Sequence, residues 1–345
     1  MAHPGIVIAT GMHQIHHKWP AMIAKEQHFL SDEGLLKTAV ITTNHNDDNL
    51  GQALIAGNIH FGLDAKPQDV LRWVTKQGAD IFIIGCYKNQ FHMAVMGAKG
   101  MKSLVDLKGK RIGVSTGKAD TRVSLDAAQA RIMLKSVGLD PEKDVTWVTG
   151  PRFHHVQGDP MDALQKGEAD CVFVTDLDAT KFQAEGFPIL LRFKEFYRDG
   201  YPDRNLITTG TIIEKYPATV TAFLKAMIRA LRFLRDMPKN HDYMVDLDKR
   251  LRAAESDPKE RDAKIDLSVE KLAGSPHPLD CRLPLEGFQT IIEQEKEAGM
   301  IPQSFDAAQI VRLEFVEQAN QELDTRLDLQ DELKRVKQWI VKFGY

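Results

Sequence analysis

Histidine is the residue type whose placement in this chain most strongly suggests chemistry. The 345 residues include twelve histidines, and most of them lie in or just beyond segments that read as β-strands. In a doubly wound α/β sheet, the carboxyl ends of the strands face the ligand crevice. An imidazole at that edge can act as a general acid, a general base or a metal ligand. The histidines placed in this way are His13, His16, His17, His45, His60, His92, His154 and His155.

The densest group of histidines is His13, His16 and His17, in the loop expected after the first strand. Neutral imidazoles suit iron, zinc, nickel or copper. Side chains elsewhere could complete such a shell, namely His60, His92, His154, Asp64 and Asp176. The spacing matches no recognised metal signature, and the same rings could instead hydrogen-bond a carboxylate or line a polar cleft. If these histidines bind a metal, the expected cofactor is a divalent ion, iron or zinc.

The candidate acid–base groups are His13, His60, His154 and His155. The last two follow Arg152, which makes that corner basic and protonatable. Loss of CO₂ from a carboxylate needs a polarised ring that accepts the electrons and a general acid that protonates the carbon. Arg152 could hold the carboxylate through two hydrogen bonds, although a lone arginine is more often structural. These residues could serve acid–base chemistry on a bound carboxylate.

The stretch 104–148 shows how the chain would position such groups. Its β-branched run Arg111–Val114 predicts a strand, followed by a polar turn and a helix with apolar residues at the helical period. Gly138 suits a left-handed helix end, and Pro141 prevents the helix from restarting. Val145–Val148 predicts the next strand. Such a strand–helix–strand unit aims its first turn at whatever binds beyond the strand ends.

That first turn is suited to an anion. Ser115, Thr116 and Gly117 offer hydroxyl and backbone N–H groups at a helix start, and Lys118 adds positive charge. Ser115 or Thr116 could equally well only cap the helix. Asp176, which follows a buried strand, could contact the ligand or cap the next helix. The candidate ligand-binding residues are Ser115, Thr116, Gly117, Lys118, Arg152, Asp176 and His92.

The rest of the chain alternates strand-like and helix-like segments, which predicts an α/β protein with helices on both faces of its sheets. The first expected strands cover residues 6–9, 36–43, 59–63 and 81–85. We expect two doubly wound lobes with mainly parallel sheets and an interlobe cleft. Residues 1–98 would form the first part of lobe 1, residues 99–204 lobe 2, and residues 205–345 the return to lobe 1. The charged helical tail 323–345 would lie on the surface or mediate a homodimer.

Three stretches resemble a known family: DLKGKRIGVS at 106–115, MDALQKGEADCVFV at 161–174 and NLITTGTIIEKYPATVTAFLKAMIRALRFL at 205–234. They are similar to the substrate-binding proteins of sulfonate, nitrate and thiamine-precursor importers. The resemblance implies the type II periplasmic-binding-protein fold, in which two lobes joined by crossing strands hold the ligand between them.

The same fold also carries cytoplasmic enzymes, among them hydroxymethylpyrimidine phosphate synthases, dihydroxyphthalate decarboxylases and an aromatic desulfinase. The desulfinase resemblance would require a nucleophilic cysteine in the first loop, where this chain has Ile15 and histidines. The synthase resemblance would require a cysteine-rich motif, and no cysteine cluster is present. Of these three enzymes, the decarboxylase is the one whose resemblance requires the fewest specific residues in this sequence.

Composition excludes several other classes of function. A net charge of −3 gives no electrostatic reason to bind nucleic acid. No apolar run approaches the length that spans a bilayer, so membrane insertion is not expected. Three widely spaced cysteines indicate reduced core residues. The chain enters its first strand without a signal peptide, which predicts a cytoplasmic protein, or a periplasmic one if a leader has been removed.

Two hypotheses follow. The first is a cytoplasmic enzyme acting on a small aromatic or heterocyclic carboxylate, either a lyase such as a decarboxylase or a hydrolase, with histidine acid–base groups. The alternative is a non-catalytic substrate-binding protein of an ABC importer, whose permease would be its partner, or a sensor. It would bind a small anion such as a sulfonate, a carboxylate or a thiamine precursor.

Overall fold

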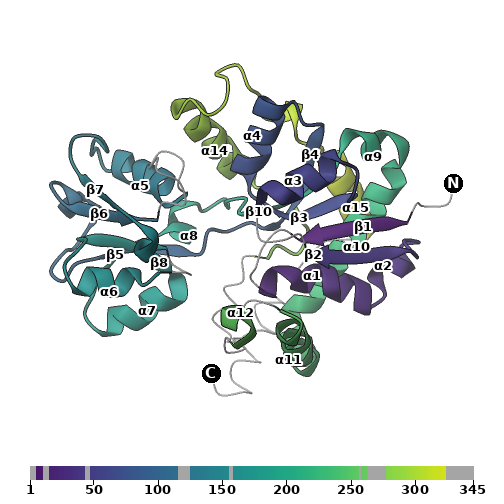
Figure 1. Ribbon diagram of the computed structural model, residues 1–345, viewed down its shortest axis with the longest axis horizontal. Helices are drawn as coiled ribbons and strands as arrows, with labels where there is room; N and C mark the ends of the chain where they lie inside the picture. Colours follow the sequence, from purple (N-terminus) through teal and green to yellow (C-terminus); the bar gives the residue numbers. More distant parts are fainter. Residues whose placement is uncertain are drawn as a thin grey trace. The chain divides into compact units, whose positions relative to one another are not determined.

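The computed structural model describes residues 5–10, 15–42, 47–115, 125–154, 158–255, 258–262 and 277–323 (Figure 1). The chain divides into two compact units. Unit 1 comprises residues 1–90 and 201–345, and unit 2 is the continuous segment 91–200.

Unit 1 is built on a sheet whose five described strands run in the order β2-β1-β3-β10-β4. These strands are β1 (Ile6–Thr10), β2 (Thr38–Thr42), β3 (Phe61–Ala65), β4 (Ile81–Lys88) and β10 (Arg204–Thr209). β1 is parallel to β2 and β3, whereas β10 is antiparallel to β3 and β4. The carboxyl ends of β1, β3 and β4 therefore meet the amino end of β10 along one side of the sheet, the carboxyl edge of unit 1.

Helices cover both faces of this sheet (Figure 1). One face carries α1 (Ile15–Glu26), α2 (Phe29–Asp32), α10 (Pro217–Arg235), α11 (Met237–Ala253) and α15 (Glu314–Glu322). The other face carries α3 (Asp47–Ile55), α4 (Pro67–Gln77) and α14 (Leu285–Glu297). The apolar side of α10 fills the core of the first face, where the ring of Phe223 stacks on that of Phe61 at 4.1 Å between centroids. Shorter segments in unit 1 are α9 (Gly210–Lys215), α12 (Pro258–Asp262) and η3 (Ala307–Gln309).

Unit 2 has its own five-stranded sheet among the described residues, in the order β7-β6-β8-β5-β9. Its strands are β5 (Met93–Gly97), β6 (Arg111–Val114), β7 (Thr146–Thr149), β8 (Cys171–Thr175) and β9 (Ile189–Arg192). β6 is parallel to β7 and β8, whereas β5 is antiparallel to β8 and β9. The helical segments are η1 (Leu104–Leu107), α5 (Leu125–Ser136), η2 (Pro151–Phe153), α6 (Pro160–Gln165), α7 (Asp176–Ala184) and α8 (Phe193–Phe196).

The α/β class and the two lobes are confirmed, but in the described strands of each sheet only half of the strand pairings are parallel. The reason is the same in both units. The strand that follows each passage between the units, β5 or β10, inserts antiparallel to its two neighbours. These insertions also place the unit boundaries at 90/91 and 200/201, whereas the sequence-based ones were 98/99 and 204/205.

The stretch 104–148 forms the predicted strand–helix–strand unit, with Gly138 in the left-handed region at φ 76°. The start of α1 differs from its prediction. We expected His16 and His17 in a loop after the first strand, but the helix begins at Ile15, so both lie in its first turn. Burial explains the difference, because His17 and the three residues that follow it are packed inside unit 1.

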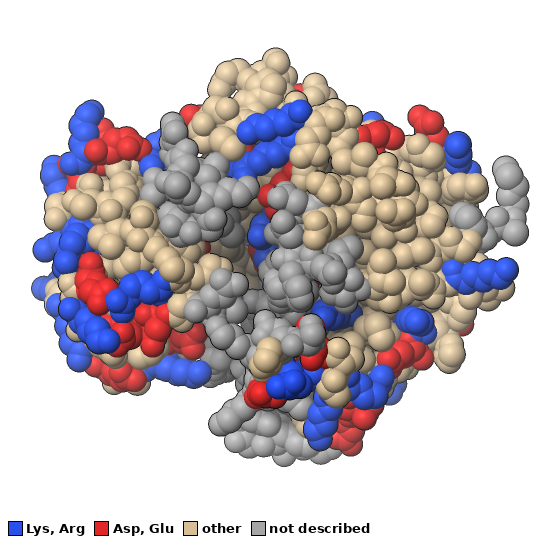
Figure 2. All heavy atoms as spheres, viewed as in Figure 1, with Lys and Arg blue, Asp and Glu red and all other residues tan. Residues whose placement is uncertain are grey.

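The visible surface has a mixed charge pattern. Figure 2 shows basic and acidic side chains interspersed over the described parts of the face in view, in agreement with the small net charge. In the described part of the chain, no helix combines the length and the apolar character needed to cross a membrane. The expected tail helix lies outside the described residues from position 324 onward.

Candidate functional site

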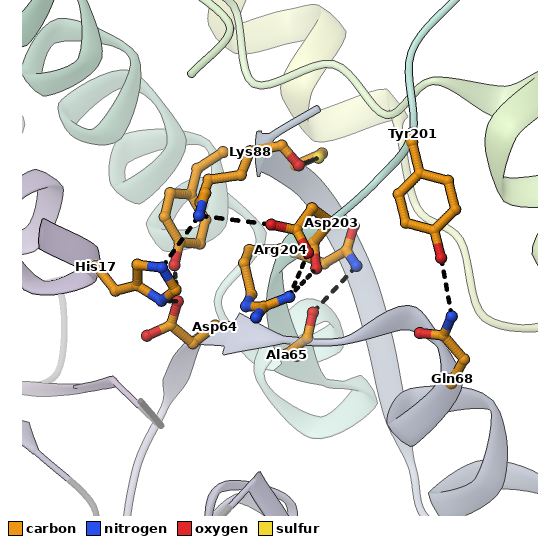
Figure 3. A network of polar contacts seen from close by, with 11 residues as sticks. His17, Asp64, Ala65, Gln68, Lys88, Tyr201, Asp203 and Arg204 are labelled. Carbon is orange, nitrogen blue, oxygen red and sulfur yellow. Dashed lines mark hydrogen bonds and ion pairs between the residues drawn. The ribbon is translucent and has the colours of Figure 1, made fainter. Parts of the chain in front are cut away.

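The carboxyl edge of unit 1 holds a buried network of ionisable side chains (Figure 3). Its members are His17, Asp64, Lys88, Asp203 and Arg204. α1 supplies the histidine, β3 the first aspartate, the end of β4 the lysine, and the start of β10 the last two residues. The order of the parallel strands and the antiparallel insertion of β10 bring these four segments together.

His17 lies at the centre of the buried network. Its Nε2 is 3.0 Å from Nζ of Lys88. Its Nδ1 is 2.9 Å from Oδ1 of Asp64, at an angle too bent for a hydrogen bond. Both ring nitrogens therefore face charged groups (Figure 3). The hydroxyl of Tyr87 donates to the same carboxylate oxygen of Asp64.

Lys88 links the histidine to a second ion pair. Its Nζ lies 3.5 Å from Oδ2 of Asp203. Arg204 pairs with the carboxylate of Asp203 and donates to its main-chain carbonyl at 2.8 Å. In all three residues about nine-tenths of the side chain is buried, so the charges are only weakly screened by solvent.

Burial and neighbouring charges change the protonation of this network. Burial, followed by the positive charge of Lys88, holds the pKa of His17 well below its usual value, so this imidazole is neutral at neutral pH. Burial also lowers the pKa of Lys88, although Asp203 acts in the opposite direction. Burial alone would raise the pKa of Asp203, but Arg204, Lys88 and Lys66 together bring it below its ordinary value.

Among the described residues of the buried network and Lys66 beside it, the fixed charges have a positive excess. Lys66, at the N-cap of α4, is close enough to act on the carboxyl of Asp203. With both carboxylates of the buried network ionised, Lys66, Lys88 and Arg204 outnumber them. Neutral His17 does not change this balance. The edge can therefore attract an anion, and its charged groups are held in place before any ligand arrives.

A second set of contacts holds the buried network in place. Asp64 has a left-handed backbone at φ 74°, which aspartate tolerates better than most residues, and its carboxylate meets Tyr87 and His17. The ring of His277 stacks on that of Tyr87 at 5.9 Å, and its Nδ1 lies 2.8 Å from the carbonyl of Tyr87. Asn205 donates from Nδ2 to the carbonyl of Ala65 at 3.1 Å.

Unit 2 has a smaller cluster at the corresponding edge of its sheet, where β8 and β9 end and β5 begins. We call Asp176, His92, Arg192 and Lys194 the Asp176 cluster. Arg192 approaches Oδ1 of Asp176 at 2.9 Å. Nδ1 of His92 and Nζ of Lys194 each lie 3.5 Å from its Oδ2. Thr175, not Asp176, is the N-cap of α7, and it accepts a hydrogen bond from the backbone N–H of Asp178 at 3.2 Å. The structure thus brings together two of the predicted ligand-binding residues, Asp176 and His92.

Ser115 lies at the end of β6 on the same edge of unit 2. Its hydroxyl donates to Oδ2 of Asp126, near the start of α5, and both side chains are buried. Ser115 is thus tied to the following helix. Its predicted partners in the anion-binding turn, Thr116, Gly117 and Lys118, lie outside the described residues.

His60 does not lie where the sequence placed it. It precedes β3, whose first residue is Phe61, and so occupies the edge of the sheet opposite to Asp64. Its Nδ1 accepts from the backbone N–H of Val7 at 2.9 Å, and its carbonyl accepts from Oγ1 of Thr208 at 2.7 Å. Burial lowers the pKa of His60. These contacts give the ring a role in joining β1, β3 and β10.

Arg152 is paired within unit 2. Its guanidinium donates to Asp162 at 2.9 Å and also to Glu168, so two carboxylates of its own unit already occupy the planar group that was expected to hold a ligand. His154 follows η2 and is half-buried, with its carbonyl accepting from the backbone N–H of Gly158 at 2.8 Å. His13, His45 and His155 lie outside the described residues.

The expected metal shell is not assembled in the described part of the chain. No group of three or more His, Cys, Asp or Glu side chains there could hold a metal ion. His16 packs edge-on against His17, with ring centroids 4.3 Å apart, and both nitrogens of His17 already face Asp64 and Lys88. All three cysteines are buried, and burial raises the pKa of each thiol, so none is set up as a thiolate nucleophile.

Sequence reasoning missed Lys88, Asp203 and Arg204 as site residues. A signal was present for two of them. Lys88 ends an apolar strand and Arg204 begins one, and a charged residue directly bordering a buried strand needs a partner. Asp203 carries no such signal, because Lys88 becomes its neighbour only when β10 inserts beside β4.

Comparison with known proteins found a family model that matches this chain and solved structures with a similar fold. The family model described as "NMT1/THI5 like" matches residues 16–241. No curated protein matches. Among solved structures, a putative periplasmic sulfonate-binding protein SsuA from Methylobacillus flagellatus has a TM-score of 0.64 at 16% identity, covering 93% of this chain and 95% of that one.

Two further solved structures are similar to this chain. The periplasmic nitrate-binding protein NrtA from Synechocystis has a TM-score of 0.60 at 14% identity, covering 95% of this chain and 90% of that one. The desulfurization enzyme DszB has a TM-score of 0.55 at 15% identity, covering 92% of this chain and 99% of that one. At these identities the likeness shows the fold, and the family follows from the sequence match over about two-thirds of the chain. The chain belongs to the NMT1/THI5-like family.

Proposed function

We propose that this protein binds a small anion without transforming it, and that the carboxyl edge of unit 1 supplies the positive charge. The observation that carries the proposal is the excess of cations over carboxylates around the buried network. Lys88 and Arg204 are held by neighbours before a ligand arrives, so little ordering would be needed on binding. This choice corresponds to the alternative hypothesis from the sequence.

The enzyme hypothesis receives less support. Of its four candidate acid–base groups, His60 lies at the opposite edge of the sheet, and His13 and His155 fall outside the described residues. His154 remains, beside an arginine that is paired with two carboxylates of its own unit. The four groups predicted to act as acid and base in a lyase or hydrolase reaction are therefore not assembled into a pair among the described residues.

The solved relatives indicate the class of anion. The SsuA proteins are described as sulfonate-binding and NrtA as nitrate-binding. Both ligand types carry delocalised negative charge on oxygen, which lysine and arginine recognise well. We propose a sulfonate, nitrate or carboxylate ligand, with an ABC permease as partner. These relatives are described as periplasmic, so the comparisons give no support to the cytoplasmic location expected from the start of the sequence.

Titration calorimetry with nitrate, methanesulfonate and benzoate tests the proposal. At least one anion should bind, raise Tm with its concentration, and be recovered unchanged by NMR. Lys88→Met should weaken this binding about tenfold or more, the equivalent of about 1.4 kcal/mol. The matched control is Lys225→Gln in α10, which removes a cation paired with Glu33 at 2.6 Å and Glu322 at 2.9 Å in the same unit.

Three results would overturn the proposal. Conversion of a bound anion into product would restore the enzyme hypothesis. Equal affinities of wild type, Lys88→Met and Lys225→Gln would remove the carboxyl edge of unit 1 from the binding site. Failure of all three anions to bind would also count against it.

A further inference from the structure

The first turn of α1 is held from two sides. On one side, His17 contacts Asp64 and Lys88 of the buried network. On the other side, the next two residues reach α11 and the segment that follows it. Nε1 of Trp19 donates to Asp248 at 3.1 Å, and Nζ of Lys18 donates to Glu255 at 2.7 Å. His17 thus occupies one end of a short chain of contacts whose other end is α11.

Asp248 is the central residue of this second side. Its side chain is fully buried, and it accepts from Trp19 and from Nε of Arg252 at 2.6 Å. Burying a carboxylate is costly unless its hydrogen bonds are made with good geometry. The position of α1 relative to α11 is therefore tightly specified at Trp19, two residues from His17. Figure 1 shows α11 running beside α1 on the same face of the sheet.

The family model stops at residue 241, near the start of α11. Asp248, Arg252 and Glu255 all lie beyond it. The contacts that hold the first turn of α1 from outside thus come from a part of this chain that the family match does not include. Nothing in the expected ligand-binding machinery uses these residues.

We propose that α11 is a positioning element for the anion site, and that Asp248, through Trp19, sets the placement of the His17 imidazole between Asp64 and Lys88. The proposal rests on the proposed function for its consequence in binding, but its structural claim stands on the contacts of α1. Asp248 is a positioning residue, since it contacts Trp19 and Arg252 and acts on His17 only through α1. Loss of its acceptor oxygens frees the first turn of α1 to shift.

The far end of α1 provides a matched control. The hydroxyl of Tyr243 in α11 donates to Glu26, the last residue of α1, at 2.9 Å. Tyr243→Phe therefore also removes an α11–α1 hydrogen bond, but about two turns away from His17. A general loosening of α11 would make this variant resemble an Asp248 variant. A specific effect on His17 would separate the two.

The experiment uses the full chain and four variants: Asp248→Leu, Asp248→Asn, Trp19→Phe and Tyr243→Phe. The first readout is the ¹⁵N spectrum of the histidine side chains, with His17 assigned from its absence in His17→Gln. Asp248→Leu should move or broaden the His17 signals, and Tyr243→Phe should leave them in place. Asp248→Asn keeps one oxygen for Trp19 and should restore most of the wild-type signal.

The second readout is affinity for nitrate and methanesulfonate. Asp248→Leu should bind about fivefold more weakly or worse, in the range of ordinary coupling between sites, with Tyr243→Phe unchanged. If Asp248→Leu does not fold, Trp19→Phe, which removes the indole N–H donor but keeps an aromatic ring, carries both readouts. Unaltered His17 signals in the folded Asp248 and Trp19 variants would overturn the inference. Failure of the wild type to bind either anion would overturn the proposed function instead, while the His17 spectra would still decide the positioning role.

Discussion

Asp203 in unit 1 and Asp176 in unit 2 are two equally buried carboxylates with unlike partners. Each side chain is 12% exposed. The cations around Asp203 are as buried as it is, with Lys88 at 10% and Arg204 at 9%. Around Asp176, Arg192 is 17% and Lys194 is 37% exposed. The exposed fraction of a carboxylate alone therefore does not show how well its ion pair is shielded from solvent. The exposed fractions of the partner cations are needed as well.

The largest effect expected from this difference is on stability. Asp203→Asn leaves Lys88 and Arg204 buried without their shared counter-charge, which should lower the free energy of unfolding by about 3–5 kcal/mol. Asp176→Asn leaves cations that can turn toward water, and it should cost about 1 kcal/mol. Urea denaturation of both variants measures the contrast. Equal losses would show that the two edges are energetically alike.

A smaller effect should appear as pH dependence. Because folding lowers the pKa of His17, the unfolded chain takes up a proton below about pH 6.5 that the folded chain does not. Stability should therefore fall as pH falls from about 6.5 toward the folded pKa, by up to about 1.4 kcal/mol per pH unit. His17→Gln should lose this slope. His60→Gln, at the opposite edge, should change it less, and urea denaturation at several pH values between about 5 and 8 compares the three proteins.

The smallest effect concerns salt. Lys194→Gln removes a half-exposed charge that lies 3.5 Å from Asp176, and it should cost less than about 1 kcal/mol. That loss should shrink further in about 1 M salt, where exposed charges are screened within about 3 Å. The cost of Lys88→Met should persist at the same salt concentration, since its partners are buried. A salt-insensitive Lys194→Gln would mean that the Asp176 cluster is closed to solvent like the buried network.

The fold could be predicted well from local patterns. The strand at Arg111–Val114, the helix end at Gly138 and the strand at the start of unit 1 follow from β-branched runs and glycine positions that act within a few residues. The start of α1 could not be predicted in this way. This helix contains Pro20 in its second turn, shortly after two histidines, and the segment is helical because tertiary packing buries it.

The site was harder to predict for a physical reason. The rule that strand ends face the ligand identified Asp176 and His92 as neighbours, since both lie at ends of strands that pair. The same rule misplaced His60, because this residue directly precedes the first residue of β3 and was read as part of the strand itself. Lys88 becomes a neighbour of Asp203 and Arg204 only through the antiparallel insertion of β10, which depends on contacts between residues more than a hundred positions apart.

The passages between the units have a further consequence. The backbone N–H of Tyr201 donates to the carbonyl of Asn89 at 2.8 Å, and Arg204 pairs with Lys88 just beyond. β4 and β10, the two strands that flank unit 2 in the sequence, thus already pair as the two arms of a hairpin. Residues 91–200 form one continuous insertion between them. A two-residue turn that contains glycine could connect the two strands of this hairpin directly. For protein engineering, we therefore expect that residues 91–200 can be replaced while the β4–β10 register of unit 1 is kept.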